Sequence, residues 1–190
     1  MWHPINADFF IPQLPVSIVS LPDSGGRAGI LRSLLESVNC VVLTHPMGTP
    51  GDFLKVVAQH DTAPRYLIIV GHGEPDGLWF GSYAPYIDSS MLQGECLPAA
   101  VIRQHVGLAG STVIADCCYG GTKEMAEAFL SNGAKAYIGT DRALGAELNV
   151  FLVNFFYRVL YKKVPDKEAV EQAIHATELE VESLRYFAGK

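Results

Sequence analysis

Two short segments of this 190-residue sequence set reactive side chains beside glycine. His72 lies between Gly71 and Gly73, directly after the apolar run at 66–70. The adjacent Cys117 and Cys118 follow the apolar run at 112–115. A thiolate is a strong nucleophile, and a neighbouring imidazole can take or return its proton. These residue types therefore indicate nucleophilic catalysis by a cysteine, provided that the two segments meet.

Each segment also has an ordinary structural explanation. A His-Gly pair after a strand is often only a turn, and a cysteine at a strand end is often a small buried hydrophobic residue. The catalytic interpretation depends on both side chains reaching the same place. The elements before them must therefore end side by side.

Short apolar runs alternate with helical patterns along most of the chain. Strands are expected at 16–21, 40–43, 66–70, 112–115 and 136–138, with a short hairpin arm at 78–83. Helices are expected at 30–38, 53–58, 98–105, 122–130, 148–160 and 170–184. This alternation is typical of an α/β fold, a three-layer sandwich of a mainly parallel sheet with helices on both faces. Ligands of such sheets bind at the carboxyl ends of strands, where His72 and Cys118 are expected.

The composition predicts one domain over residues 1–190. Hydrophobic residues make up 49% of the chain and charged residues 18%, which suits a buried core. A net charge of −6 without a basic block argues against nucleic acid as a partner. No apolar run approaches the roughly 18 residues of a membrane span, so no membrane partner is expected. The first ten residues, MWHPINADFF, lack the pattern of a signal peptide, and the four cysteines are too few for a disulfide framework, so a cytoplasmic protein is expected.

No metal and no cofactor is expected. His45 also ends a strand, but no histidine or cysteine spacing typical of a metal site occurs. The glycines after position 70 do not follow the dinucleotide-binding spacing. Cys40 and Cys96 are interpreted as structural residues. The phenylalanine-rich helix at 148–160 is interpreted as core, with a homodimer interface as the alternative.

The two reactive segments resemble motifs of the caspase-like (clan CD) cysteine peptidases, most closely those of metacaspases; gingipains and CHAT-domain proteins belong to the same group. Gly71-His72-Gly73 is similar to the metacaspase Ser-Gly-His-Gly. The run at 116–121 resembles their Asp-Cys-Cys-His-Ser-Gly, with Tyr119-Gly120 in place of His-Ser. His72 precedes Cys118 by 46 positions, close to the spacing of about 50 in caspases. The order of elements from about 16 to 161 is also similar to the caspase-like topology.

The resemblance implies a cysteine-type endopeptidase with a catalytic dyad of Cys118 and His72, acting on a peptide or protein substrate. It implies that the backbone N–H groups of Gly73 and Cys118 hold the oxyanion. It also implies that Asp116 and Asp23 line a pocket for Arg or Lys of the substrate, with Asp141 a third candidate. Asp23 is equally well explained as a turn or helix-cap residue. Residues 120–135 look like one helix, so activation by cleavage at a linker is not expected.

Two alternatives stay open at the level of sequence. The Cys-x-x-Gly spacing fits Cys117 with Gly120 as well as Cys118 with Gly121. Strand alternation favours Cys118 as the nucleophile, with Cys117 packed beneath it. The second alternative concerns function: a degenerate caspase-like domain would bind peptides or proteins without cutting them, and a flavodoxin-like binder would make the dyad incidental.

Overall fold

The structure, a computed structural model, describes residues 13–143, 145, 147–177 and 184–189. Its main sheet has six strands in the order β2-β1-β3-β7-β8-β9. Their bounds are β1 Leu14–Ser20, β2 Cys40–Pro46, β3 Tyr66–Val70, β7 Thr112–Asp116, β8 Ala136–Gly139 and β9 Arg185–Ala188. The first five strands run parallel, and β9 pairs antiparallel with β8. The expected mainly parallel sheet is confirmed.

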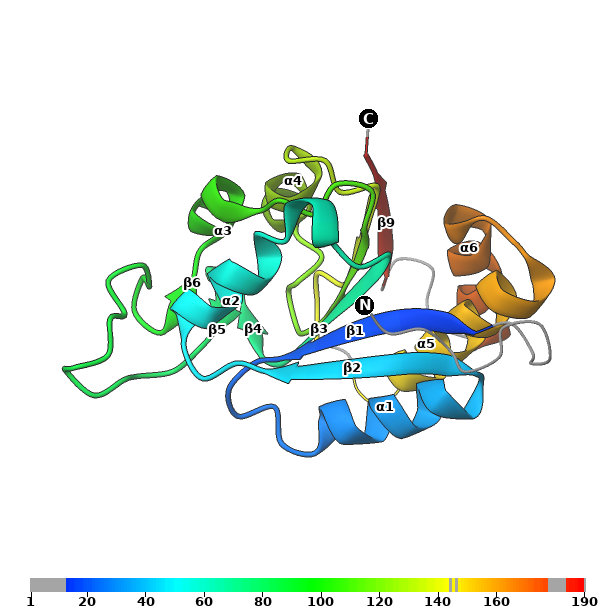
Figure 1. Ribbon diagram of the computed structural model, residues 1–190, viewed down its shortest axis with the longest axis horizontal. Coiled ribbons are helices and arrows are strands. Elements are labelled where there is room, and N and C mark those ends of the chain that lie inside the picture. The colour runs from blue at the N-terminus through cyan, green and yellow to red at the C-terminus, as the bar shows by residue number, and fades with distance from the viewer. Residues whose placement is uncertain (1–12, 144, 146, 178–183, 190) are drawn as a thin grey trace.

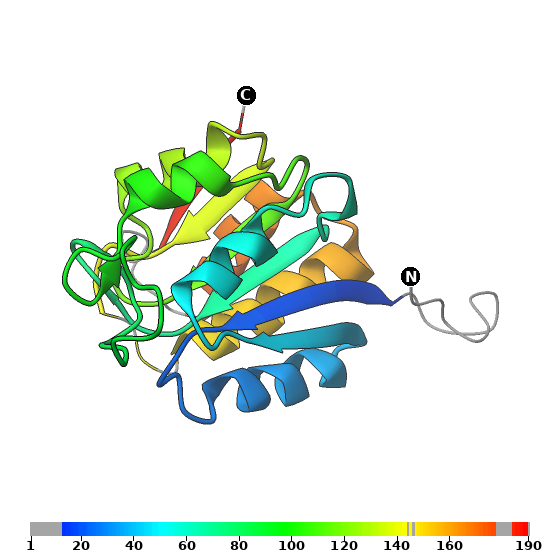
Figure 2. The ribbon, with the colours of Figure 1, turned by 60° about the vertical axis from the view of Figure 1, so that its left-hand side comes forward.

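Helices cover both faces of this sheet, as Figures 1 and 2 show. The helices α1 (Arg27–Ser37), α5 (Glu147–Tyr157) and α6 (Asp166–Ala176) bury one apolar core with the sheet. The helices α2 (Pro50–Val57), α3 (Ala99–His105) and α4 (Lys123–Leu130) bury the other. Alternate residues of a strand point to opposite faces, so Ile114 packs toward α1 and α5 while Val113 packs toward α2–α4. The predicted three-layer sandwich is confirmed.

A small antiparallel sheet lies at the carboxyl edge of the main one, on the left in Figure 1. It consists of β4 (Gly73–Glu74), β5 (Gly77–Trp79) and β6 (Cys96–Leu97). The predicted hairpin arm at 78–83 is therefore wrong in extent, because the strand ends at Trp79. Since β3 ends at Val70 and β4 begins at Gly73, His72 lies in the short connection between the two sheets.

The C-terminal part differs most from expectation. The predicted helix at 170–184 ends at Ala176, and positions 178–183 lie outside the described residues. Arg185–Ala188 forms β9, which the sequence pattern did not predict, because its pairing partner β8 lies about fifty positions earlier in the chain. The helix at 148–160 ends at Tyr157 and continues as one π-helical turn, Arg158–Lys162, while a 3₁₀ turn, His60–Thr62, follows α2.

The phenylalanine-rich helix α5 lies in the core of the protein. Phe151, Phe155 and Phe156 of α5 are fully buried, as the core interpretation requires. No helix within the described ranges is long and apolar enough to cross a membrane. The N-terminal ten residues, on which the signal-peptide argument rests, lie outside the described part of the chain.

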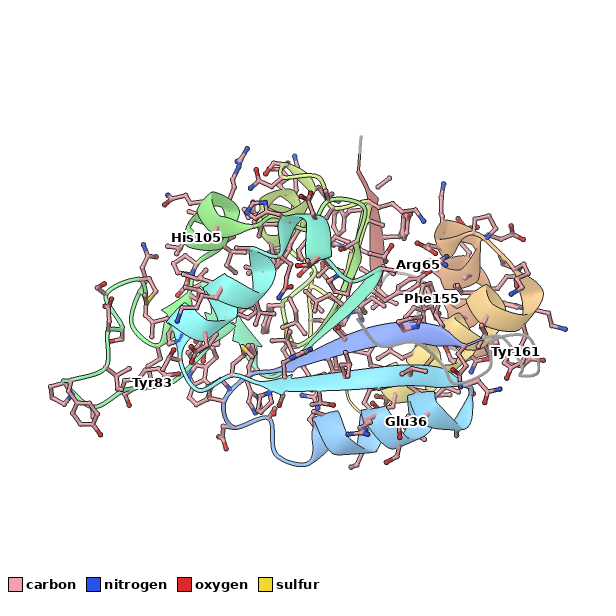
Figure 3. The ribbon with its side chains drawn as sticks, in the orientation of Figure 1. Glu36, Arg65, Tyr83, His105, Phe155 and Tyr161 are labelled. Carbon is pink, nitrogen blue, oxygen red and sulfur yellow. The ribbon has the colours of Figure 1, made fainter. Side chains whose placement is uncertain are left out.

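A buried carboxylate fastens α6 to the amino ends of β3 and β7. Asp166 accepts hydrogen bonds from the Tyr66 hydroxyl (2.8 Å), the Thr112 hydroxyl (2.7 Å) and the Lys135 ammonium (2.9 Å). Burial alone would raise the pKa of Asp166, but hydrogen bonds from Lys135, Thr112 and Tyr66 outweigh it and lower the pKa. In Figure 3 this end of the molecule is on the right, where Arg65, Phe155 and Tyr161 are labelled. Tyr83 is labelled at the opposite end.

Replacing Asp166 with alanine should lower the free energy of unfolding at pH 7 by about 1–3 kcal/mol, because two buried hydroxyls lose their acceptor. The folded pKa of Asp166 lies below the unfolded value of about 3.9. Its stabilisation is therefore complete above about pH 4 and is lost as the pH falls through the folded pKa. Urea unfolding at several pH values should show the wild type and the variant converging in acid.

The matched control is Lys135→Met, since the Lys135 side chain is half-exposed. It should cost less than about 1 kcal/mol. Equal losses in the two variants would contradict the assignment of the carboxylate as the centre of this network.

Candidate active site

His72 and Cys118 leave adjacent, parallel strands. β3 and β7 are paired in register up to Val70 and Asp116, and the Gly71 N–H then donates to the Asp116 carbonyl (3.2 Å). His72 and Cys118 each follow the last paired residue of their strand by two positions. The sheet therefore brings the two residues to the same edge, as the sequence analysis required.

Gly73 lets the two connecting segments touch. A Cβ atom at Gly73 would lie 2.2 Å from the Cys118 carbonyl oxygen, a distance that no side chain tolerates against backbone. Only glycine permits so close an approach. The backbone beside His72 thus rests directly on the backbone of Cys118.

The exposed His72 ring is held from two directions. Its Nε2 lies 3.1 Å from the Asp23 carbonyl oxygen. Because a carbonyl only accepts, Nε2 carries a proton and donates it, which leaves Nδ1 as the acceptor of the neutral ring. The Trp79 ring meets the imidazole edge-on, with the ring centroids 5.9 Å apart. These contacts fix both the orientation and the tautomer of His72.

The two neighbouring cysteines occupy different environments. Cys117 is buried in the apolar core between the sheet and α2–α4, and burial raises the pKa of its thiol far above the usual value. Cys118 is half-buried and belongs to neither core. Strand alternation predicts this division, with the accessible thiol on Cys118.

The turn after β7 leaves one backbone donor unused. The N–H groups of Tyr119, Gly120 and Gly121 donate to the carbonyls of Arg142 (3.5 Å), Cys117 (3.2 Å) and Thr140 (2.6 Å). Within the described ranges, the Cys118 N–H has no acceptor. Tyr119 adopts a φ of 56°, in the left-handed region that non-glycine residues rarely occupy. A backbone N–H without an acceptor is able to bind an oxyanion.

Asp116 does not present a free carboxylate. It is buried, and its Oδ1 lies 2.5 Å from the Nη2 of Arg27, the first residue of α1. Burial raises the pKa of Asp116, and the Arg27 guanidinium opposes that shift without cancelling it. The place expected for a basic group of the substrate is filled by an arginine of the chain itself.

The other two acidic candidates also have structural engagements. Asp23 contacts His72 through its backbone carbonyl, and its φ of 55° marks a tight turn, in line with the turn interpretation. The Asp141 carboxylate forms an ion pair with Arg185 of β9. The structure thus brings Asp23 to His72, but by its backbone rather than by its side chain.

Sequence reasoning missed Arg27. Its partners lie 44 and 89 positions away, so no local motif contains them. One weak signal was available: a cation in the first turn of a helix opposes the helix dipole, and α1 has no acidic residue there. An arginine at so unfavourable a position needs a tertiary partner.

A cavity of about 440 Å³ is lined by residues that lie close to His72 and Cys118 in the sequence, although neither His72 nor Cys118 lines it. Its lining includes Glu74, which follows His72 by two positions, and Tyr119, which follows Cys118. Among the described residues no group of three or more side chains could hold a metal ion. His45 ends β2, which β1 separates from β3.

The remaining thiols, those of Cys40 and Cys96, are buried. Burial raises the pKa of Cys40 to about 12 and that of Cys96 to about 11. A thiol with such a pKa holds almost no thiolate at neutral pH. These values agree with the structural role that the sequence analysis gave both residues.

No family model and no curated protein matches the chain by sequence. Among solved structures the chain is similar to the Arg-specific cysteine proteinase gingipain R, with a TM-score of 0.56 and 12% identity over 93% of this chain and 46% of that one. The fold is similar to that of a caspase-like proteinase. A complex of the pro- and mature domains of this gingipain from Porphyromonas gingivalis gives a TM-score of 0.55 and 13% identity, over 93% and 47% of the two chains. The chain thus spans a little under half the length of these gingipains, and at such identity the likeness extends to the fold alone.

The contrast between the two cysteines predicts selective alkylation. In the folded protein at pH 7.5, iodoacetamide should modify Cys118 at least about tenfold faster than Cys117, because only Cys118 is accessible and Cys117 is held as a buried thiol. Mass spectrometry that localises the label measures both rates. In denaturing urea the two rates should converge, and equal rates in the native protein would contradict the assignment.

Gly73→Ala should disturb the site, because the new Cβ would press against the Cys118 carbonyl oxygen. We expect a loss of about 1–3 kcal/mol in unfolding free energy and a slower alkylation of Cys118. Gly29→Ala in α1 is the matched control, since nothing lies within 4 Å of its Cβ position. That change should be neutral or stabilising by up to about 1 kcal/mol, and like behaviour of the two variants would refute the close contact at Gly73.

Proposed function

We propose that the chain is a cysteine-type endopeptidase in which Cys118 is the nucleophile and His72 is the acid–base group. The observation that supports this most directly is the His72 ring, oriented by the Asp23 carbonyl and carried on a backbone that rests on Cys118. The accessibility of Cys118 and the likeness of the fold to a cysteine proteinase favour the same class of reaction.

In the first half of the proposed reaction, the Cys118 thiol gives its proton to Nδ1 of His72. The sulfur bonds to the carbonyl carbon of the scissile peptide, and the carbonyl electron pair moves onto oxygen. The ring is then positively charged, and the hydrogen bond from Nε2 to the Asp23 carbonyl becomes charge-assisted and stronger.

The oxyanion would accept hydrogen bonds from the N–H groups of Cys118 and Gly73. Each such donor is typically worth about 3–4 kcal/mol in the transition state. As the intermediate collapses, the carbon–nitrogen bond breaks and Nδ1 of His72 protonates the leaving amine, which leaves a thioester on Cys118. His72 then takes a proton from water, the hydroxide adds to the thioester, and the thiol departs with that proton.

The finer expectation, cleavage after Arg or Lys, depends on a free Asp116. A substrate guanidinium would have to displace Arg27, which makes three hydrogen bonds at this place. The Arg specificity of gingipain R is a property of that protein. We therefore propose a peptidase in which Asp116 does not select the substrate side chain. The substrate side chains would instead enter the cavity lined by Glu74 and Tyr119, where Asp76, Glu124 and Glu127 add further carboxylates.

Peptidyl acyloxymethyl ketones that carry Leu, Arg or Asp next to the ketone test this proposal. The attacking sulfur displaces the carboxylate and forms a stable thioether, so labelling reports the nucleophile itself. Wild-type protein should be labelled, and Cys118→Ala should not. His72→Ala should react at least about 100-fold more slowly. The Asp probe should react most slowly of the three, because carboxylates line the cavity.

Cys117→Ala is the control for the neighbouring thiol, and it should keep the labelling of the wild type. Labelling that persists in Cys118→Ala but disappears in Cys117→Ala would reassign the nucleophile. A folded wild-type protein that reacts with none of the probes would refute the peptidase and favour the alternative of a peptide- or protein-binding domain.

A further inference from the structure

Arg27 joins the ends of the two strands that carry the dyad. Its Nη1 donates to the Gly71 carbonyl (3.1 Å), the residue before His72. Its Nη2 donates to the Asp116 carboxylate (2.5 Å) and lies at 3.5 Å from the Asp116 carbonyl, two residues before Cys118. One planar guanidinium thus links the chain just before the histidine with the chain just before the cysteine.

Arg27 makes these hydrogen bonds at the point where the pairing of β3 with β7 ends. The paired register of β3 and β7 ends at Val70 and Asp116, and one further bond joins the Gly71 N–H to the Asp116 carbonyl. Beyond it, β3 leads into the small sheet and β7 into the turn toward α4. His72 and Cys118 belong to these diverging segments, so a tie at Gly71 and Asp116 limits how far they separate.

Arg27 also lies close in sequence to the loop that orients His72. Asp23, whose carbonyl binds His72, precedes Arg27 by only four positions. A hydrogen bond between the Ser20 and Ser24 hydroxyls (2.7 Å) lies within this loop. Arg27 therefore begins the helix that follows the Asp23 loop, and its guanidinium binds the ends of β3 and β7.

Because Asp116 is buried, its ion pair with Arg27 is not a chance contact between two surface side chains. The Asp116 side chain is 3% exposed, whereas that of Arg27 is 38% exposed. Burying a carboxylate is costly unless a partner offsets the cost, and an exposed pair would have avoided it. Only a planar cation with several donors reaches both the Gly71 carbonyl and the Asp116 carboxylate at once.

We propose that Arg27 is a positioning residue, which holds His72 against Cys118 by tying Gly71, Asp116 and the Asp23 loop together. The inference rests on the proposed peptidase function, because it assigns Arg27 a role in the dyad of that reaction. Misplacement of a catalytic group by about 1 Å typically costs up to about 100-fold in rate. Arg27 would act on the reaction through the placement of these groups and would not touch the substrate.

The test measures the rate of Cys118 alkylation by iodoacetamide at pH 7, which needs no peptide substrate. In the wild type, His72 should take the thiol proton of Cys118 as the sulfur attacks the reagent, so the reaction should be fast. In Arg27→Met the rate should fall about tenfold, because His72 is no longer held in that place. The unfolding midpoint in urea is recorded for each variant.

Two further variants separate positioning from folding. Arg27→Lys keeps a positive charge beside Asp116, but the lysine ammonium is a point cation that cannot span both acceptors. This variant should therefore restore the unfolding midpoint of the wild type and leave the alkylation of Cys118 slow. Arg27→Met combined with Asp116→Leu removes the buried charge together with its partner, and should fold while alkylation stays slow. Wild-type alkylation in any folded variant without the arginine, or full rescue by lysine, would overturn the inference.

His72→Ala tells the two proposals apart. If it slows alkylation of Cys118 while Arg27→Met does not, the dyad stands and the positioning role of Arg27 is refuted. If His72→Ala leaves the alkylation rate of Cys118 unchanged, His72 does not act on Cys118, and the proposed function falls together with the role of Arg27 in it. A slow reaction in both variants supports both proposals.

Discussion

The parallel pairing of β3 with β7 is the constraint on which the rest of the candidate site depends. Five residues of each strand are paired in a fixed register, and all ten are buried. A shift of this register by one residue would turn every side chain of one strand to the other face of the sheet. His72 and Cys118 meet at one edge because burial on both faces leaves the two strands a single alignment.

A buried carboxylate clamps each end of this strand pair, and the two carboxylates differ in their surroundings. At the amino ends, Asp166 receives three hydrogen bonds, which outweigh burial and lower its pKa. At the carboxyl ends, Asp116 has one charged partner, which does not cancel the effect of burial, and its pKa is raised. The hydrogen bonds to Asp166 thus compensate its burial better than the ion pair with Arg27 compensates that of Asp116. The less compensated charge, that of Asp116, lies at the candidate active site, where strain and unfavourable burial are common.

The backbone contributes to this site as much as the side chains do. The Asp23 carbonyl sets the tautomer of His72, Gly73 allows the contact with Cys118, and the Cys118 N–H stays free of an acceptor among the described residues. One of the residues involved, Tyr119, holds a positive φ value that its bulky side chain does not favour. Such conformations persist only where surrounding contacts impose them. The site is therefore a product of the packed sheet, and the loops by themselves would not keep it.

The sequence by itself was sufficient for the five parallel strands, the α/β class, the mainly parallel sheet and the placement of His72 and Cys118 at one edge. These follow from apolar periodicity and from the rule that parallel strands end together, both of which are local or topological. Tertiary structure alone decided that β9 closes the sheet, that Arg27 holds Asp116, and that Asp23 serves His72 through its carbonyl. Each of these contacts joins residues about 50 to 90 positions apart. Such a contact depends on where the packed sheet leaves an unpaired strand edge, a buried charge or a ring nitrogen. A sequence pattern includes both partners of such a contact but does not give the distance between them in the folded protein.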